Sequence, residues 1–211
     1  MEREMTHTVI VVGAGPAGLY ASKMLCAAGC SVILVNRDIR PGGLAEYGIY
    51  WDKFKMKAGL RKQFAQILAH PLLTYIGNVR VGNDQADITL EQLDSLGANA
   101  ILVATGAQGV NSLGLPGEMG TFGVYHAKDL VYHYNGLPPF SECNYSIGKH
   151  VGIVGMGNVM VDVAHWLICE KQVLQVTVFA RRGPGERAYT DKEMREVVAA
   201  VDTAQLAREF A

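Results

Sequence analysis

The sequence predicts an α/β protein built from two parallel sheets. Two glycine-rich turns indicate this fold, one beginning at Gly13 and the other at Gly155. Each turn follows a strand-sized apolar run rich in valine and isoleucine, and each precedes a helical stretch and a second such run. This βαβ order is typical of Rossmann-like nucleotide-binding domains. Only the second unit ends in an arginine pair, Arg181-Arg182.

The first βαβ unit is predicted from its apolar runs and their punctuation. Thr8–Val12 reads as a buried parallel strand because its apolar residues are continuous rather than alternating. Pro16 stands where a first helical turn tolerates the missing N–H, and the helix should run to Ala28 before Gly29. Ser31–Val35 is the next buried strand.

The remaining elements follow the same two periodicities. We expect a ligand-facing turn at Pro41-Gly42-Gly43-Leu44 and a capping box in which Thr190 and Glu193 start the last helix. The other predicted strands are 72–81, 100–104, 149–154 and 175–180, and the other predicted helices are 57–70, 90–96, 125–134, 158–169 and 190–201.

A loop-rich stretch from Gln108 to Gly120 suggests a boundary between domains 1–108 and 109–211. The second domain has only two predicted strands, fewer than a Rossmann half-sheet needs. We therefore expect the second domain and the C-terminal part of the first to be truncated. A C-terminal half or a partner subunit would supply the missing edges.

Composition excludes several classes of function. Hydrophobic residues form 49% of the 211 and charged residues 18%, with a net charge of −1, so nothing favours nucleic acid or an anionic membrane as a partner. No apolar run reaches the ~20 residues that span a bilayer. The four cysteines include no C-x-x-C pair, which argues against a redox dithiol or a metal site and fits a reducing cytoplasm.

The first turn has the glycine set that a dinucleotide pyrophosphate requires. Gly13 permits the tight bend, Gly15 lets the backbone approach the phosphates, and Gly18 allows close packing of helix on strand. The helix start offers unpaired N–H groups to the phosphates. An acidic residue usually follows the second strand and binds the ribose, but here that place is Asn36, with Asp38 close enough to substitute.

The second turn has a different chemistry. Met160 stands where the third glycine is expected. After its second strand come Arg181 and Arg182, where an acidic residue would select NAD. Guanidinium groups pair well with phosphate, so this position favours the 2′-phosphate of NADP.

Several motifs together resemble one family. They are Val-Val-Gly-Ala-Gly-Pro-Ala-Gly (11–18), Pro-Gly-Gly-Leu (41–44), Ala-Thr-Gly-Ala (104–107), Leu-Pro-Gly-Glu (115–118), Gly-Met-Gly-Asn-Val-Met-Val-Asp (155–162) and Arg-Arg-Gly-Pro (181–184). In this order, over nearly the whole chain, the set resembles the adrenodoxin reductase-like flavoproteins, which are FAD-dependent NADPH–ferredoxin reductases related to the small subunit of glutamate synthase.

The resemblance implies two cofactors and their contact residues. FAD would be held by Gly13, Gly15, Pro16, Ala17, Gly18, Asn36, Arg37, Gly43, Leu44, Thr105 and Gly106. NADPH would be held by Gly155, Gly157, Asn158, Val159, Arg181, Arg182 and Glu193. Glu196 would act in proton handling, with a plain surface charge as the alternative. The implied partner is a ferredoxin-like or other iron–sulfur electron acceptor.

The sequence also departs from that family. The family's first domain is completed by a returning C-terminal segment that is not found here, and Lys53 stands where adrenodoxin reductase-type members have a histidine. Two alternatives therefore stay open beside an active oxidoreductase. One is a nucleotide-binding fragment without turnover, and the other is the electron-input subunit of a glutamate synthase-like complex.

Overall fold

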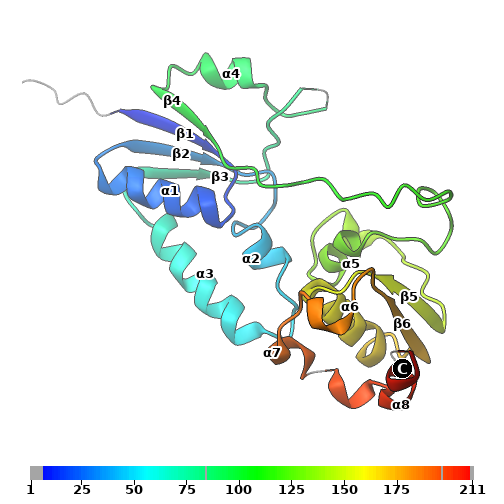
Figure 1. Ribbon diagram of the computed structural model, residues 1–211. Coiled ribbons are helices and arrows are strands. Elements are labelled where there is room, and N and C mark those ends of the chain that lie inside the picture. Colours follow the sequence, from blue (N-terminus) through cyan, green and yellow to red (C-terminus); the bar gives the residue numbers. More distant parts are fainter. Residues whose placement is uncertain (1–6, 84, 196, 210–211) are drawn as a thin grey trace, which may run out of the picture. The chain divides into compact units, whose positions relative to one another are not determined.

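The computed structural model describes residues 7–83, 85–195 and 197–209, which form two compact units (Figure 1). The first unit runs to Asn111 and also takes in Tyr132–Ser141. The second consists of Ser112–Val131 and the residues from Glu142 onward. Each unit contains one parallel sheet and one glycine-rich turn.

The sheet of the first unit is parallel throughout. Its strands are β1 (Thr8–Val12), β2 (Ser31–Val35), β3 (Leu73–Ile76) and β4 (Ala100–Val103), in the order β3-β2-β1-β4. In the register of β1, Val9 lies opposite Val32 on one side and Ala100 on the other. This order is that of a Rossmann half-sheet, with the glycine turn at the carboxyl end of the central strand β1.

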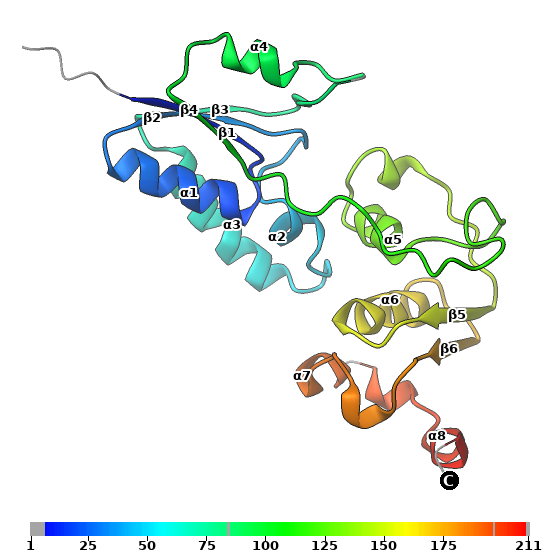
Figure 2. The same ribbon diagram turned by 45° about the horizontal axis from the view of Figure 1, so that its top comes forward.

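Helices cover both faces of this sheet (Figure 2). Val9 and Val11 point to the face covered by α1 (Pro16–Ala27) and α3 (Phe54–Leu68), where they pack with Leu19 and Phe64. Ile10 and Val12 point to the opposite face and pack with Leu93 of α4 (Leu90–Asp94). Burial on both faces explains why β1 reads as a continuous apolar run.

Two further elements complete this unit. The short helix α2 (Leu44–Tyr47) follows the Gly42–Gly43 turn. The last turn of α5 (Ala127–Tyr134) and the segment to η1 (Phe140–Glu142) return to the first unit, where Tyr132, Leu137 and Phe140 pack on Tyr47.

The second unit has a smaller sheet. Strands β5 (His150–Val154) and β6 (Gln175–Phe179) are parallel, and α6 (Asn158–Cys169) connects them. The chain then forms η2 (Pro184–Glu186), α7 (Asp191–Met194), η3 (Val198–Ala200) and α8 (Thr203–Glu209). Within the described ranges, no helix is both long and apolar enough to pass through a bilayer.

The fold confirms the predicted α/β class, and most boundaries agree within a few residues. The strand expected at 72–81 ends at Ile76, because the chain turns at Gly77 and Asn78, whose φ is +56°. The prediction of a single helix over 190–201 is wrong, because α7 covers only Asp191–Met194. Val197 instead donates to the Met194 carbonyl, a bond of the tighter i→i+3 type. The sequence did not predict α2.

Candidate functional site

The two glycine turns have the same backbone geometry. Gly13 has a φ of +108°, and its N–H donates to the carbonyl of Val35 at the end of β2, at 2.7 Å. Gly155 has a φ of +119°, and its N–H donates to the carbonyl of Phe179 at the end of β6, at 2.9 Å. Positive φ favours glycine, so both turns need glycine at this first position.

Three glycines of the first turn have separable tasks. A Cβ on Gly18 would lie 1.8 Å from the Gly13 carbonyl oxygen, and a Cβ on Gly13 would lie 2.5 Å from the Ala104 carbonyl oxygen. Both glycines are therefore required by packing. A Cβ on Gly15, in contrast, would meet nothing within 4 Å. The space in front of Gly15 is open, which suits the close approach of a ligand's phosphates.

The start of α1 adds donors at the same place. Gly15 is the N-cap residue and has no side chain to bond the first N–H groups of the helix, while Pro16 has no N–H at all. Pro16 and Ala17 are exposed at this end. An open glycine, free helix N–H groups and the positive end of the helix dipole form a donor set that fits a pyrophosphate.

A second glycine turn closes on the first. The Gly42 N–H donates to the Ala14 carbonyl at 2.7 Å, and a Cβ on Gly43 would lie 3.0 Å from the Gly15 Cα. The next residue, Leu44, is exposed at the start of α2. The predicted contact residues Gly43 and Leu44 are thus brought beside the first glycine turn.

A buried carboxylate fixes α2 behind this turn. Glu46 is 3% exposed and accepts two hydrogen bonds from Arg61 of α3, at 2.6 and 2.7 Å, and one from Arg40 at 3.3 Å. Such a forked pairing is among the strongest polar contacts in proteins. It ties the Gly42–Gly43 turn to α3, the long helix of the unit.

Lys57 lies near the same carboxylate, Glu46, together with Arg61 and Arg40. Burial raises the pKa of Glu46, but the hydrogen bond and charge of Arg61, with Lys57 and Arg40, bring that pKa below its ordinary value. Burial lowers the pKa of Lys57, whose Nζ donates to Asn135 at 2.8 Å. Asn135 in turn donates to the Tyr47 carbonyl. These contacts join α2 and α3 to the segment after α5.

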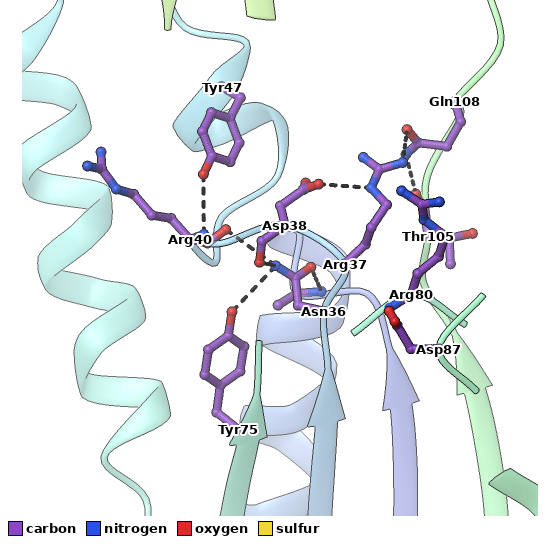
Figure 3. Close-up of polar contacts among 11 residues, drawn as sticks. Asn36, Arg37, Asp38, Arg40, Tyr47, Tyr75, Arg80, Asp87, Thr105 and Gln108 are labelled. Carbon is purple, nitrogen blue, oxygen red and sulfur yellow. Dashed lines mark hydrogen bonds and ion pairs between the residues drawn. The ribbon is translucent and has the colours of Figure 1, made fainter. Parts of the chain in front are cut away.

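Asn36 clamps three parts of the first site together (Figure 3). Its Oδ1 accepts the N–H of Ala14 in the glycine turn at 3.1 Å. Its Nδ2 donates to the carbonyls of Asp38 and Arg40, at 2.9 and 3.3 Å, and to the Tyr75 hydroxyl at 3.4 Å. The residue is 6% exposed, so its amide is engaged with the protein itself. A ribose contact by Asn36 stays a prediction.

The predicted residues Arg37 and Thr105 are linked through Gln108 at the carboxyl end of the sheet. The Arg37 Nε donates to the Asp38 carboxylate at 2.8 Å, and its Nη1 donates to the Gln108 Oε1 at 3.2 Å. Gln108 donates to the Thr105 carbonyl at 2.8 Å (Figure 3). Gly106 follows with a φ of +68°. The loops that follow the carboxyl ends of β2 and β4 are thus hydrogen-bonded to each other.

We expect Asn36→Asp to destabilise the first unit by about 2 kcal/mol, because the new oxygen would replace a donor that faces two carbonyls. Urea unfolding followed by circular dichroism measures this loss. The same change at the exposed loop residue Asn111 is the control and should be nearly neutral. Equal midpoints for both variants would refute the clamp.

The second turn is open at the same position as the first. A Cβ on Gly157 would meet nothing within 4 Å, and Val159 is 48% exposed in the first turn of α6. Arg181 and Arg182 follow β6 after one residue, Ala180, and both are exposed. The Arg182 Nε lies 3.8 Å from the Glu186 Oε1. The arginine pair thus occupies the strand end where an adenosine ribose is expected in this fold.

Other predicted residues of this site fall near the same turn. The Asn158 Oδ1 accepts the Thr190 N–H at 3.0 Å. Thr190 caps α7 as predicted, because its hydroxyl accepts the Glu193 N–H at 3.3 Å. This is one half of the predicted capping box, since the Thr190 N–H, which the Glu193 side chain would accept in such a box, donates to Asn158. Glu196 lies outside the described residues, and its predicted role stays a prediction.

Sequence reasoning missed the groups that support the sites. Glu46 and Arg61 are 15 residues apart on different helices, so no local spacing marks them as partners. The motif Pro-Gly-Gly-Leu identified Gly43 as a contact residue. Its contact with Gly15 could not be predicted, because the two residues are far apart in the sequence. Over the described ranges, no group of three or more histidine, cysteine, aspartate or glutamate residues could hold a metal ion.

Comparisons with known proteins agree with this geometry. The chain is 34% identical over 213 residues to the mitochondrial NADPH:adrenodoxin oxidoreductase of Arabidopsis thaliana, covering 90% of this chain and 43% of the relative. It is 31% identical to the NADPH-ferredoxin reductase FprA of Mycobacterium leprae, covering 95% and 50%. A solved structure of an FprA variant from Mycobacterium tuberculosis superposes with a TM-score of 0.80 at 29% identity, covering 93% and 48%.

The chain thus spans about half the length of these relatives. The profile of the pyridine nucleotide-disulphide oxidoreductase family matches residues 7–205, which include both glycine turns and the arginine pair. On this match and on the paired βαβ units, the chain belongs to the pyridine nucleotide-disulphide oxidoreductase family.

Proposed function

We propose that this chain provides the two nucleotide sites of a flavoprotein that passes electrons from NADPH to an iron–sulfur acceptor. The observation that carries the proposal is the repeat of one turn geometry in two units, of which only the second ends in an arginine pair. Relatives named as NADPH:adrenodoxin oxidoreductase and NADPH-ferredoxin reductase support the same chemistry.

The first turn is proposed to hold FAD. Its open glycine and helix N–H groups would bind the pyrophosphate. Asp38 is 15% exposed in its side chain and lies beside Arg37 at the end of β2, so we assign it as the substitute ribose partner, while Asn36 keeps the loop in place. The Glu46–Arg61 pair holds the Gly43 turn against the phosphates.

The second turn is proposed to hold NADPH, with Arg181 and Arg182 on its 2′-phosphate. When bound, NADPH supplies a hydride and FAD accepts it, then releases electrons singly. The protein's share is binding, orientation and the exclusion of water, so no side-chain nucleophile is needed.

We expect the double change Arg181→Ala and Arg182→Ala to weaken NADPH binding by about 100-fold, because two charge-assisted contacts to the 2′-phosphate are lost. NADH, which lacks that phosphate, should bind equally well to both proteins. Calorimetric titration measures both affinities. Lys149→Ala removes an exposed cation just before β5, at its amino end, and serves as the control. A parallel loss for NADH would contradict the assignment.

Anaerobic addition of NADPH to the FAD-loaded protein tests electron transfer. We expect the visible absorption band of the flavin to bleach with NADPH and to return when an oxidised ferredoxin is added. Retention of both nucleotides without bleaching would overturn the proposal and favour a binding module without turnover. Co-purification with a large synthase subunit would instead favour the glutamate synthase-like alternative.

A further inference from the structure

The segment Arg187–Glu193 lies beside the second glycine turn and is bonded to it at two points. The Ala188 N–H donates to the Met156 carbonyl at 3.1 Å, and Gly157 and Ala188 form an isolated parallel bridge. The Thr190 N–H donates to the Asn158 Oδ1 at 3.0 Å. The first bond uses backbone alone, whereas the second depends on the side chain of Asn158.

Contacts within the Arg187–Glu193 segment give it an order of its own. The Thr190 hydroxyl accepts the Glu193 N–H at the start of α7. The Arg187 guanidinium donates to the Asp191 carboxylate at 2.7 Å and lies 5.7 Å from the centre of the Tyr189 ring. Because the segment is braced internally, fixing Thr190 also fixes the residues on either side of it.

The bonds that join this segment to the turn lie at its surface. Asn158, Ala188 and Thr190 are exposed, whereas Tyr189 and Glu193 of the segment are half-buried. Hydrogen bonds therefore connect the exposed contact points, and the Asn158 amide supplies a side-chain bond that links the segment to α6. Asn158 is the first residue of α6, directly after the glycine turn.

We propose that Asn158 is a positioning residue, which couples the phosphate-binding conformation of the second turn to the placement of the Arg187–Glu193 segment. When the turn is formed, Asn158 holds Thr190, and Thr190 holds Glu193 beside the site. The part of this proposal that concerns ligand binding rests on NADPH occupying the second turn. The coupling of Asn158 to the segment does not.

Amide hydrogen exchange read by NMR tests the coupling in the protein without nucleotide. In Asn158→Ala, exchange should accelerate roughly five- to tenfold, the worth of about one hydrogen bond, at Thr190 and also at Ala188 and Glu193. The last two amides keep their own acceptors, so their acceleration reports the loss of positioning. Asn158→Asp retains an acceptor oxygen and should restore slow exchange at all three. The Gly155 amide, bonded to Phe179, should stay unchanged and shows that the turn remains folded.

Unchanged exchange at Ala188 and Glu193 in Asn158→Ala would overturn the proposal. If that variant also exposes the Gly155 amide, Thr190→Pro provides the same comparison at Ala188, because it removes the donor and leaves Asn158 in place. In the wild-type protein, NADPH should slow exchange at Ala188 and Glu193 further, and Asn158→Ala should lack this slowing. A wild-type protein that fails to bind NADPH refutes the proposed function alone, since the nucleotide-free exchange is measured independently.

Discussion

Gly18→Ala is expected to destabilise the first unit by more than about 3 kcal/mol. The new methyl carbon would stand 1.8 Å from the Gly13 carbonyl oxygen and 3.4 Å from the Val11 side chain, and Gly18 is buried. The Gly13 carbonyl belongs to the turn between β1 and α1, and Gly18 lies in α1, so only a movement of the backbone could relieve this clash. Urea unfolding followed by circular dichroism measures the loss.

Gly59→Ala is the matched control for this change. Gly59 lies in α3, is exposed, and would place its methyl carbon in open space. Because alanine is the better helix former, this variant should be more stable by about 0.5–1 kcal/mol. Equal unfolding midpoints for Gly18→Ala and the wild-type protein would show that the helix does not pack on the turn as described.

Gly15→Val should leave the fold intact and weaken FAD binding by at least about 100-fold, because the added side chain fills the space that the phosphates need. Gly15 has a φ of −73° and a ψ of 179°, a conformation that valine adopts readily, and a Cβ there meets nothing. Fluorescence titration of FAD, together with the unfolding midpoint, separates the loss of binding from any loss of stability.

Gly157→Val is the reciprocal control at the second turn, where a Cβ also meets nothing. It should lose NADPH and retain FAD, whereas Gly15→Val should lose FAD and retain NADPH. If either variant lost both nucleotides while remaining folded, the assignment of one nucleotide to each turn would be wrong.

Local signals predicted much of the fold. The bounds of Thr8–Val12, Ser31–Val35 and Asn158–Cys169 agree with β1, β2 and α6, because each begins or ends at a glycine or a turn. The Thr190 cap was likewise visible in the sequence. The length of the helix after it was not, because capping specifies where a helix begins and says nothing about where it ends.

Contacts between distant segments could not be predicted. An asparagine after β2 suggests a weak ribose partner, yet Asn36 is surrounded by two carbonyls, an N–H and the Tyr75 hydroxyl. An amide has both a donor and an acceptor, and only the fold shows that both are engaged. Nothing in the local sequence marks Glu46, because its partner Arg61 lies 15 residues away on α3. The glycines were predictable because their spacing between a strand-sized apolar run and a helical stretch marks the turn.

The most direct measurement is a titration of the FAD-loaded protein with NADP⁺, which avoids reduction of the flavin. If the two turns are separate sites, NADP⁺ binds with a stoichiometry of one, FAD stays bound, and NAD⁺ binds far more weakly because it lacks the phosphate that Arg181 and Arg182 recognise. Displacement of FAD by NADP⁺, or equal affinity for NAD⁺ and NADP⁺, would contradict the assignment of two nucleotides to two chemically different turns.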